Sequence, residues 1–255
     1  MRNTVVGLFD SLDRAREAVL DLQTLGLPRN AISIVANNAD NRYALAESTD
    51  TAADGAIMGA EKGAIWGGVA GLMLGIGTFA VPGIGPVLAA GSWATALASA
   101  LTGAGIGAVA GGLIYALLEA GVPDEHAHFY AEGIRRGGTL VVVKPSTDLA
   151  KRSAEILTTH GAINVDDGVA SYRDAGFNRF DETLQPLTAE EIAANRQTLA
   201  ALSRARHGDG THARIYDEIG VDYSIPTMDT QASLENEPFA GSASGEPSRE
   251  HAVQR

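Results

Sequence analysis

The chain has 255 residues, a formal net charge of −12 at pH 7 and no cysteine. Nucleic-acid-binding proteins need clustered lysine and arginine to neutralise phosphates, and this acidic chain has no such stripe, so we expect no nucleic-acid partner. The lack of cysteine excludes disulfides, thiolate catalysis and cysteine-ligated zinc. This length allows one large domain or a small domain with appendages.

Residues 1–38 have the pattern of a strand, a helix and a second strand. TVVGLF is a short apolar run, and AISIVAN supplies the second strand. Between them, DSLDRAREAVLDLQTLG places apolar residues at helical spacing. Asp10 or Ser11 can cap this helix, and Gly26 ends it. The first residues do not resemble a signal peptide, because the apolar run is short and acidic residues follow at once.

Residues 52–120 have a different character, because most of this segment is uncharged. No charged side chain occurs between Lys62 and Glu119. A helix in contact with water would carry a polar face, which this stretch lacks. The motif VPGIGP divides the stretch, since two prolines and two glycines interrupt a helix. The pattern therefore predicts a helical hairpin, roughly Asp54–Ala80 and Ala89–Glu119.

Glycine recurs at every fourth position in the first half of this segment, GAIMGAEKGAIWGGVAGLMLG. Small residues at this spacing let two helix backbones approach closely, as in pairs of transmembrane helices. The second half repeats the spacing with glycine, threonine and serine. We therefore predict a glycine zipper that packs the helices and promotes homo-oligomers. Its predicted helix-packing positions are Gly55, Gly59, Gly63, Gly67, Gly71, Gly75, Gly91, Gly103, Gly107 and Gly111.

The length of the uncharged run favours a hairpin embedded in a lipid bilayer. Gly63–Ala80 would span about 27 Å as a helix, close to the ~30 Å hydrocarbon layer, and Gly91–Leu118 is longer. Lys62, Arg135 and Arg136 flank the hairpin, which would place both of its ends on the cytoplasmic side of an inner or plasma membrane. The alternative is a cytoplasmic assembly in which copies of the chain shield the helices from water.

Residues 121–173 resume the alternation of strands and helices. The pattern predicts a short helix over VPDEHAHFYAEGIRRGG and a strand over TLVVVK. It then predicts a helix over STDLAKRSAEILTTHG and a last strand over AINVDDGVASY. Together with residues 1–38, this order predicts an α+β fold, namely a ferredoxin-like split βαβ domain interrupted by the glycine-zipper hairpin. For residues 174–255 we predict a polar tail that is mostly disordered. It contains one short helix, which Thr188 and Glu191 cap.

Several short motifs imitate catalytic or binding sites, but their context argues against them. GAGIGA fits a dinucleotide fingerprint, yet no strand precedes it. His126 and His128 are two residues apart, which places them on different faces of a helix. We expect Asp166 and Asp167 to lie in a solvated turn and not to form a catalytic pair. We therefore expect no catalytic residues, no metal and no cofactor.

Three stretches carry a resemblance to a known family: TVVGLFDSLDRAREAVLDL followed by AISIVA, then VPGIGPVLAAG, and then GVPDEHAHFYAEGIRRGGTLVVVK. With these, the chain resembles the bacterial general stress protein family of the heat-induced type, over about Thr4 to Tyr172. The resemblance implies a small α/β domain split by a glycine-zipper insertion and induction under stress. It implies no catalytic residues.

The sequence thus predicts a non-enzymatic, membrane-associated general stress protein whose glycine-zipper hairpin promotes self-association. Two alternatives stay open. One is a soluble oligomeric scaffold, and the other is a regulatory domain that binds a small ligand at the ferredoxin-like sheet.

Overall fold

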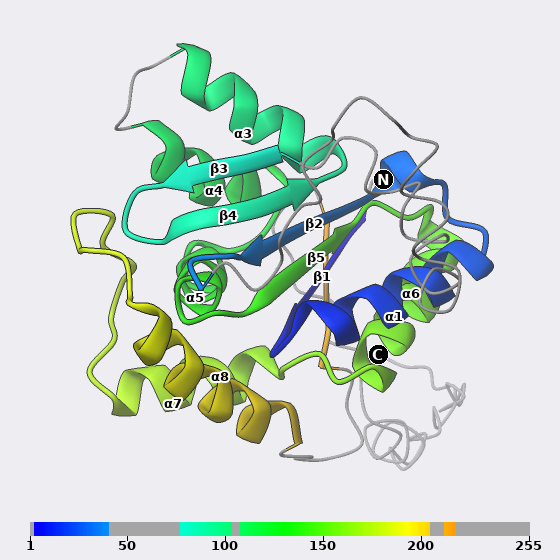
Figure 1. Ribbon diagram of the computed structural model, residues 1–255. Coiled ribbons are helices and arrows are strands. Elements are labelled where there is room, and N and C mark those ends of the chain that lie inside the picture. The colour runs from blue at the N-terminus through cyan, green and yellow to red at the C-terminus, as the bar shows by residue number, and fades with distance from the viewer. Residues whose placement is uncertain (1–2, 41–76, 104–107, 205–211, 218–255) are drawn as a thin grey trace, which may run out of the picture. The chain divides into compact units, whose positions relative to one another are not determined.

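The computed structural model describes residues 3–40, 77–103, 108–204 and 212–217. They form one antiparallel sheet with helices on both faces (Figure 1). The strands lie in the order β3-β4-β2-β5-β1-β6. Their bounds are β1 Thr4–Phe9, β2 Ile32–Asn37, β3 Gly77–Val81, β4 Gly85–Ala90, β5 Thr139–Val143 and β6 Arg214–Tyr216. The predicted α+β class is therefore confirmed.

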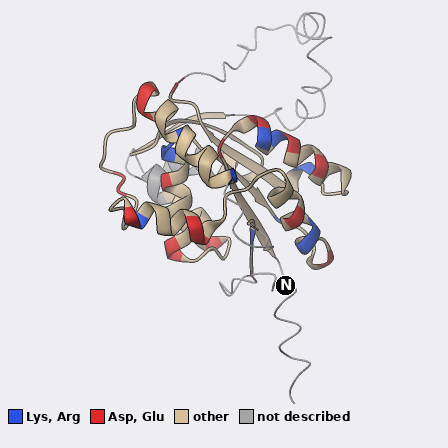
Figure 2. Cartoon of the chain, turned by 90° about the horizontal axis from the view of Figure 1, so that it is seen from below, with Lys and Arg blue, Asp and Glu red and all other residues tan. Residues whose placement is uncertain are grey.

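Seven α-helices lie within the described residues. They are α1 Leu12–Thr24, α3 Ser92–Gly103, α4 Ala108–Glu119, α5 Asp124–Arg135, α6 Thr147–Thr159, α7 Val165–Asp174 and α8 Ala189–Arg204. A 3₁₀ turn, Arg29–Ala31, leads into β2. Strands β1 to β5 contain no charged residue, and Figure 2 shows that most positions of charged residues lie on the helices.

The sheet separates two hydrophobic clusters, because successive side chains of a strand point to opposite faces. On β1, Val5 and Phe9 pack with the residues of α1 and α6 on one face. Val6 and Leu8 pack on the other face with residues of α3, α4, α5 and α7. Every residue of β1 and β5 is buried, which accounts for the continuous apolar runs TVVGLF and TLVVV.

The middle of the predicted helical hairpin is a β-hairpin instead. Strands β3 and β4 pair in the register Phe79↔Val87, and the VPGIGP motif forms the turn between them, where the Ile84 N–H donates to the Val81 carbonyl over 3.0 Å. Strand β4 then pairs with β2, with Ile34 opposite Ala90. The predicted end of the first helix at Ala80 and start of the second at Ala89 are therefore wrong. Apolar residues without charge suit a buried strand as well as a buried helix, and the open edge of β2 decides between them.

The second predicted helix, Ala89–Glu119, is also divided. Helices α3 and α4 have 12 residues each, about 18 Å of helix, and pack against each other. The first predicted helix lies mostly in residues 41–76, outside the described part of the chain.

The predicted last strand, AINVDDGVASY, is wrong, because Val165–Asp174 forms helix α7. The side chain of Asn164 caps this helix by accepting from the N–H groups of Asp166 at 2.9 Å and Asp167 at 3.4 Å. Two carboxylates in the first turn add favourable charge there. Strand β6, from the predicted polar tail, instead pairs with β1.

The helix predicted in that tail is confirmed as α8. Its capping box is present: the Glu191 N–H donates to Thr188 Oγ1 over 3.3 Å, and the Thr188 N–H donates to the Glu191 carboxylate over 2.8 Å. A largely buried ion pair between Arg196 and Asp40 ties α8 to the end of β2, and Arg196 also donates to the Gly137 carbonyl over 3.0 Å.

Candidate functional site

The structure describes only three of the ten predicted helix-packing glycines. Gly55, Gly59, Gly63, Gly67, Gly71, Gly75 and Gly107 lie outside the described residues. Gly103 is the last residue of α3, and Gly111 lies within α4. Gly91 lies in neither helix, because it forms the turn between β4 and α3.

Position 91 requires glycine because its backbone lies close against the sheet. Its φ is +79°, a conformation that disfavours other L-residues, and a Cβ built on it would lie 2.3 Å from the Ile32 carbonyl oxygen. This close approach lets the chain leave β4 and begin α3 directly against β2. The side chain of Ser92 then lies 3.1 Å from Ser33 on that strand, oxygen to oxygen.

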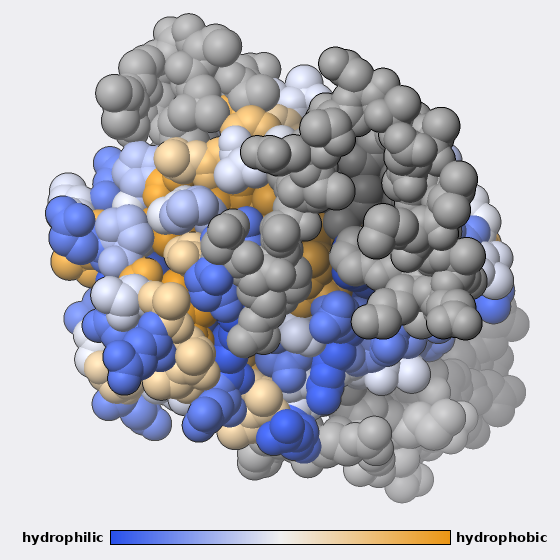
Figure 3. Space-filling model, viewed as in Figure 1, coloured by the Kyte–Doolittle hydropathy of each residue, from blue (hydrophilic) through white to orange (hydrophobic). Residues whose placement is uncertain are grey.

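Helices α3 and α4 cover the sheet with one side and leave exposed on the other a surface whose one charged residue, among those described, is Glu119 at the end of α4. Trp93, Leu97, Leu113 and Leu117 are at most 4% exposed. The exposed residues of α3 and α4 that lack charge define what we call the α3–α4 surface: Ser92, Thr95, Ala96, Tyr115 and Leu118. Figure 3 shows orange and pale colours over β3 and the beginning of α3, and a mixture of blue, white and pale orange over α7 and α8.

Two large apolar side chains stand out on the α3–α4 surface. Tyr115 is 65% exposed and Leu118 is 40% exposed, although both belong to a helix that buries its other leucines. None of the described helices combines the length and the hydropathy that a membrane span requires.

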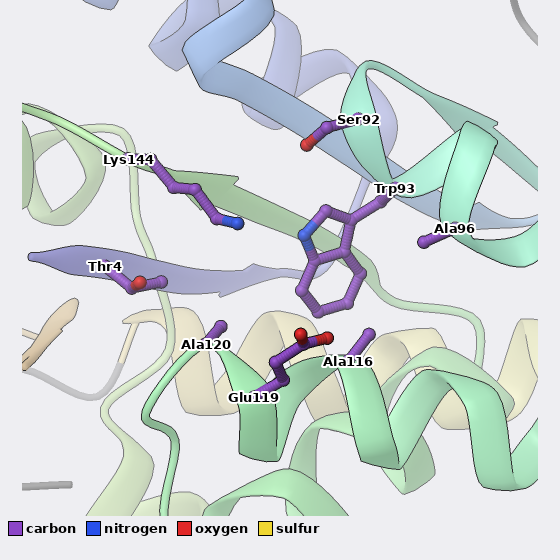
Figure 4. Close-up of a pocket in the computed structure, with 8 residues that line it drawn as sticks. All are labelled: Thr4, Ser92, Trp93, Ala96, Ala116, Glu119, Ala120 and Lys144. Carbon is purple, nitrogen blue, oxygen red and sulfur yellow. The ribbon is translucent and has the colours of Figure 1, made fainter. Parts of the chain in front are cut away.

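A cavity of about 290 Å³ opens where β1 begins, β5 ends, α3 begins and α4 ends. Figure 4 shows its lining: Thr4, Ser92, Trp93, Ala96, Ala116, Glu119, Ala120 and Lys144. The Trp93 indole lies at the centre; the Lys144 side chain points toward the indole nitrogen from the left, and Glu119 lies below the six-membered ring in this view. Of the lining residues that the structure describes, these two are the charged ones.

Backbone hydrogen bonds hold the walls of this cavity in place. The N–H of Lys144, directly after β5, donates to the Ala31 carbonyl over 2.8 Å. Helix α4 ends in a tight turn, in which the Gly121 N–H bonds to Leu118 and the Val122 N–H to Leu117, each over 3.0 Å. Lys144 and Glu119 were not singled out from the sequence, because nothing local indicates that residues so far apart in the chain share a cavity.

A second hollow, of about 840 Å³, lies between α4, α5 and residues 176–184. His128 lines it with a side chain only 6% exposed, and neither ring nitrogen makes a hydrogen bond within the described residues. Its Nε2 lies 3.6 Å from an Asp124 carboxylate oxygen, which also contacts Arg179 at 3.4 Å. Burial lowers the pKa of His128 below the ordinary 6.5; Arg179 lowers it further, and Asp124 partly opposes this.

The lowered pKa of His128 predicts a loss of stability in mild acid. Below about pH 6.5 the unfolded chain binds a proton at this residue before the folded chain does, so protonation favours unfolding. The free energy of unfolding should therefore fall as the pH drops through 6.5 toward the lower pKa of the folded state. His128→Phe should flatten that part of the curve, as measured by urea denaturation at a series of pH values. Parallel curves for the two proteins would contradict this assignment.

Within the described residues, the histidine and aspartate motifs make structural contacts, whereas GAGIGA lies mostly in residues 104–107, outside the described part of the chain. His126 lies against Tyr216, with its Nδ1 3.0 Å from the hydroxyl, and Tyr216 lies 3.1 Å from the Tyr130 hydroxyl, so these rings join α5 to β6. Asp166 forms an ion pair with Arg214 on β6. Across the described ranges, no group of three or more histidine and carboxylate side chains could hold a metal ion.

Comparison of the chain with protein-family models, curated proteins and solved structures finds no match. The α+β architecture and the α3–α4 surface are therefore the basis for assigning a function.

Proposed function

We propose that this protein is a non-enzymatic protein of the general stress type that associates with further copies of itself through the α3–α4 surface. We propose that its sheet and the helices α1 and α6 form a ferredoxin-like domain. Strands β2, β5, β1 and β6 are adjacent in the order that such a domain requires, and α1 and α6 cover one face together. In this arrangement β6 takes the place of the last strand, and the β3–β4 hairpin with α3 and α4 forms the insertion.

The observation that carries the proposal is the exposure of Tyr115 and Leu118 in a stretch without charge. No charged residue occurs from Gly77 to Leu118. Two copies with a formal charge of −12 each repel one another, and this repulsion is weakest where uncharged surfaces meet. A second copy of this chain is therefore the partner that fits the surface. The predicted zipper row from Gly55 to Gly75 continues the same low-charge segment toward the N-terminus.

A glutamate on this surface is expected to break the association. Leu118→Glu or Tyr115→Glu would bury a charge at the contact, so the mass of the full chain in solution should fall to that of a monomer. Analytical ultracentrifugation measures this mass. Thr159→Glu is the matched control, because it adds the same charge to an exposed position of α6, on the other side of the sheet.

Two outcomes would overturn this function. One is a wild-type chain that is monomeric at every concentration tested, and the other is an assembly that the two glutamate variants leave intact. A further variant, Gly67→Leu with Gly71→Leu, tests the predicted zipper row by crosslinking, since leucine would keep two helix backbones apart.

A second candidate function is association with a lipid bilayer. It is favoured by the absence of charge between Lys62 and Glu119, which removes the largest cost of placing protein in hydrocarbon. Carbonate extraction of cell membranes tests it with the untagged full chain. If the protein stays in the membrane pellet, the result supports insertion into the bilayer. If it is released into the supernatant, the result contradicts insertion and leaves self-association in solution as the function.

A further inference from the structure

We propose that the cavity around Trp93, Lys144 and Glu119 binds a compact zwitterion, such as a free α-amino acid or a betaine. Its volume of about 290 Å³ lies at the lower end of the range for small-molecule sites and suits a ligand of that size. The cavity shares Ser92 and Ala96 with the α3–α4 surface, but the inference rests on the cavity and its two charged residues and not on the exposed Tyr115 and Leu118.

The charges on the cavity wall have the pattern that a zwitterion requires. Lys144 offers an ammonium group to a carboxylate, and Glu119 offers a carboxylate to an ammonium group. Neither side chain makes an ion pair within the described part of the chain, so both are available to a ligand. In Figure 4 the Lys144 ammonium lies beside the indole nitrogen and the Glu119 carboxylate lies below the six-membered ring, so the two charges approach different parts of the indole.

The two helix ends at the cavity reinforce this polarity. Helix α3 begins at Ser92, and the N-terminal end of a helix carries a partial positive charge that favours a carboxylate. Helix α4 ends at Glu119, and the C-terminal end carries a partial negative charge that favours an ammonium group. An anion or a cation alone would match only one of the two walls.

The rest of the lining suits the apolar part of such a ligand. The Trp93 ring supplies an aromatic face, which also attracts a quaternary or primary ammonium group. Ala96, Ala116 and Ala120 contribute small apolar walls and leave the space between the two helices open. The hydroxyl groups of Thr4 and Ser92 are the remaining polar groups and can donate to a carboxylate.

The fluorescence of Trp93 provides a direct binding test. The chain has two tryptophans, so the full chain carrying Trp66→Phe reports on Trp93 alone. Glycine betaine and L-leucine should each cause a saturable change in emission. Choline, which lacks the carboxylate, and isovalerate, which lacks the ammonium group, should bind at least about tenfold more weakly.

Two charge-removing variants complete the test. Lys144→Gln and Glu119→Gln should each raise the Kd at least about tenfold, whereas Lys151→Gln and Glu155→Gln, at exposed positions of α6, should leave it unchanged. All four positions are exposed, and a thermal melt verifies that each variant is folded. The proposal is overturned if no zwitterion gives saturation, if choline or isovalerate binds equally well, or if Lys144→Gln and Glu119→Gln bind like the parent. The oligomer mass of the same variants, measured in parallel, reports separately on the proposed function.

Discussion

Gly91→Ala is expected to lower the free energy of unfolding by about 2–5 kcal/mol. About 1–2 kcal/mol comes from placing a side chain at a φ of +79°, and about 1–3 kcal/mol comes from forcing a Cβ against the Ile32 carbonyl, 2.3 Å away. The obstacle is a backbone oxygen at the start of β2, a strand paired on both sides, so it has little freedom to move. Urea denaturation followed by circular dichroism measures the loss.

Gly26→Ala is the matched control for this prediction. Gly26 also has a positive φ, +101°, but a Cβ built on it meets nothing within 4 Å. Its replacement should therefore cost only the backbone strain, about 1–2 kcal/mol. Equal losses for the two variants would show that Gly91 does not approach β2 as closely as the structure places it. The comparison also separates the turn function of Gly91 from the helix-packing function predicted from the sequence.

The second large effect is expected for Glu132→Gln on α5. The Glu132 side chain is 4% exposed, and one of its oxygens accepts from Arg136 Nε at 2.7 Å and from Arg135 Nη1 at 3.3 Å. Glutamine removes the charge but keeps the shape, which leaves two largely buried guanidinium groups without their counter-ion. Since the arginines keep some contact with water, we expect a loss of about 3 kcal/mol, the lower end for breaking a buried ion pair.

The expected loss is large because both arginines connect α5 to distant parts of the chain. Arg135 donates to the Gly83 carbonyl in the β3–β4 turn over 3.0 Å and to the Gln185 carbonyl over 3.3 Å. The Arg136 guanidinium lies 4.3 Å from the centre of the Tyr172 ring on α7. The Glu132 carboxylate orients both guanidinium groups, so its loss should loosen all three contacts.

Glu125→Gln is the control on the same helix. Glu125 forms an ion pair with Arg173, but these side chains are 50% and 62% exposed. Water screens such a pair, so its loss should cost less than about 1 kcal/mol. Chemical denaturation of the two variants at neutral pH checks the difference. An effect of Glu132→Gln as small as that of Glu125→Gln would contradict the buried network.

The elements that the sequence predicted correctly are those with a complete local signal. Helix α1 follows from apolar residues at helical spacing between Ser11, which takes the N-cap position without a capping hydrogen bond from its side chain, and Gly26, which has a φ of +101°. Helix α8 follows from the Thr188–Glu191 capping box, and β5 from the run TLVVV. In each case the residues that determine the element lie within it or next to it.

The errors fall where the local pattern allows two structures. An apolar stretch without charge, such as GTFAV or GPVLAA, can be buried as a strand or as a helix. In VDDGVASYRD the valines favour a strand, while the Asn164 cap and the acidic first turn favour the helix that forms. Strand β6 has three residues, too short for periodicity to indicate it. The candidate ligand site was missed because its two charged residues come from α4 and from the end of β5.

By itself, therefore, the sequence determined the α+β class, the helices with caps, the strands buried on both faces and the uncharged segment from Gly63 to Leu118. Only the tertiary structure decided that β3 and β4 extend the sheet from β2, that β6 pairs with β1, and that Lys144 and Glu119 line one cavity. The physical reason is the range of the interactions. Caps and periodicity act within a few residues, whereas an open strand edge selects its partner from anywhere along the chain.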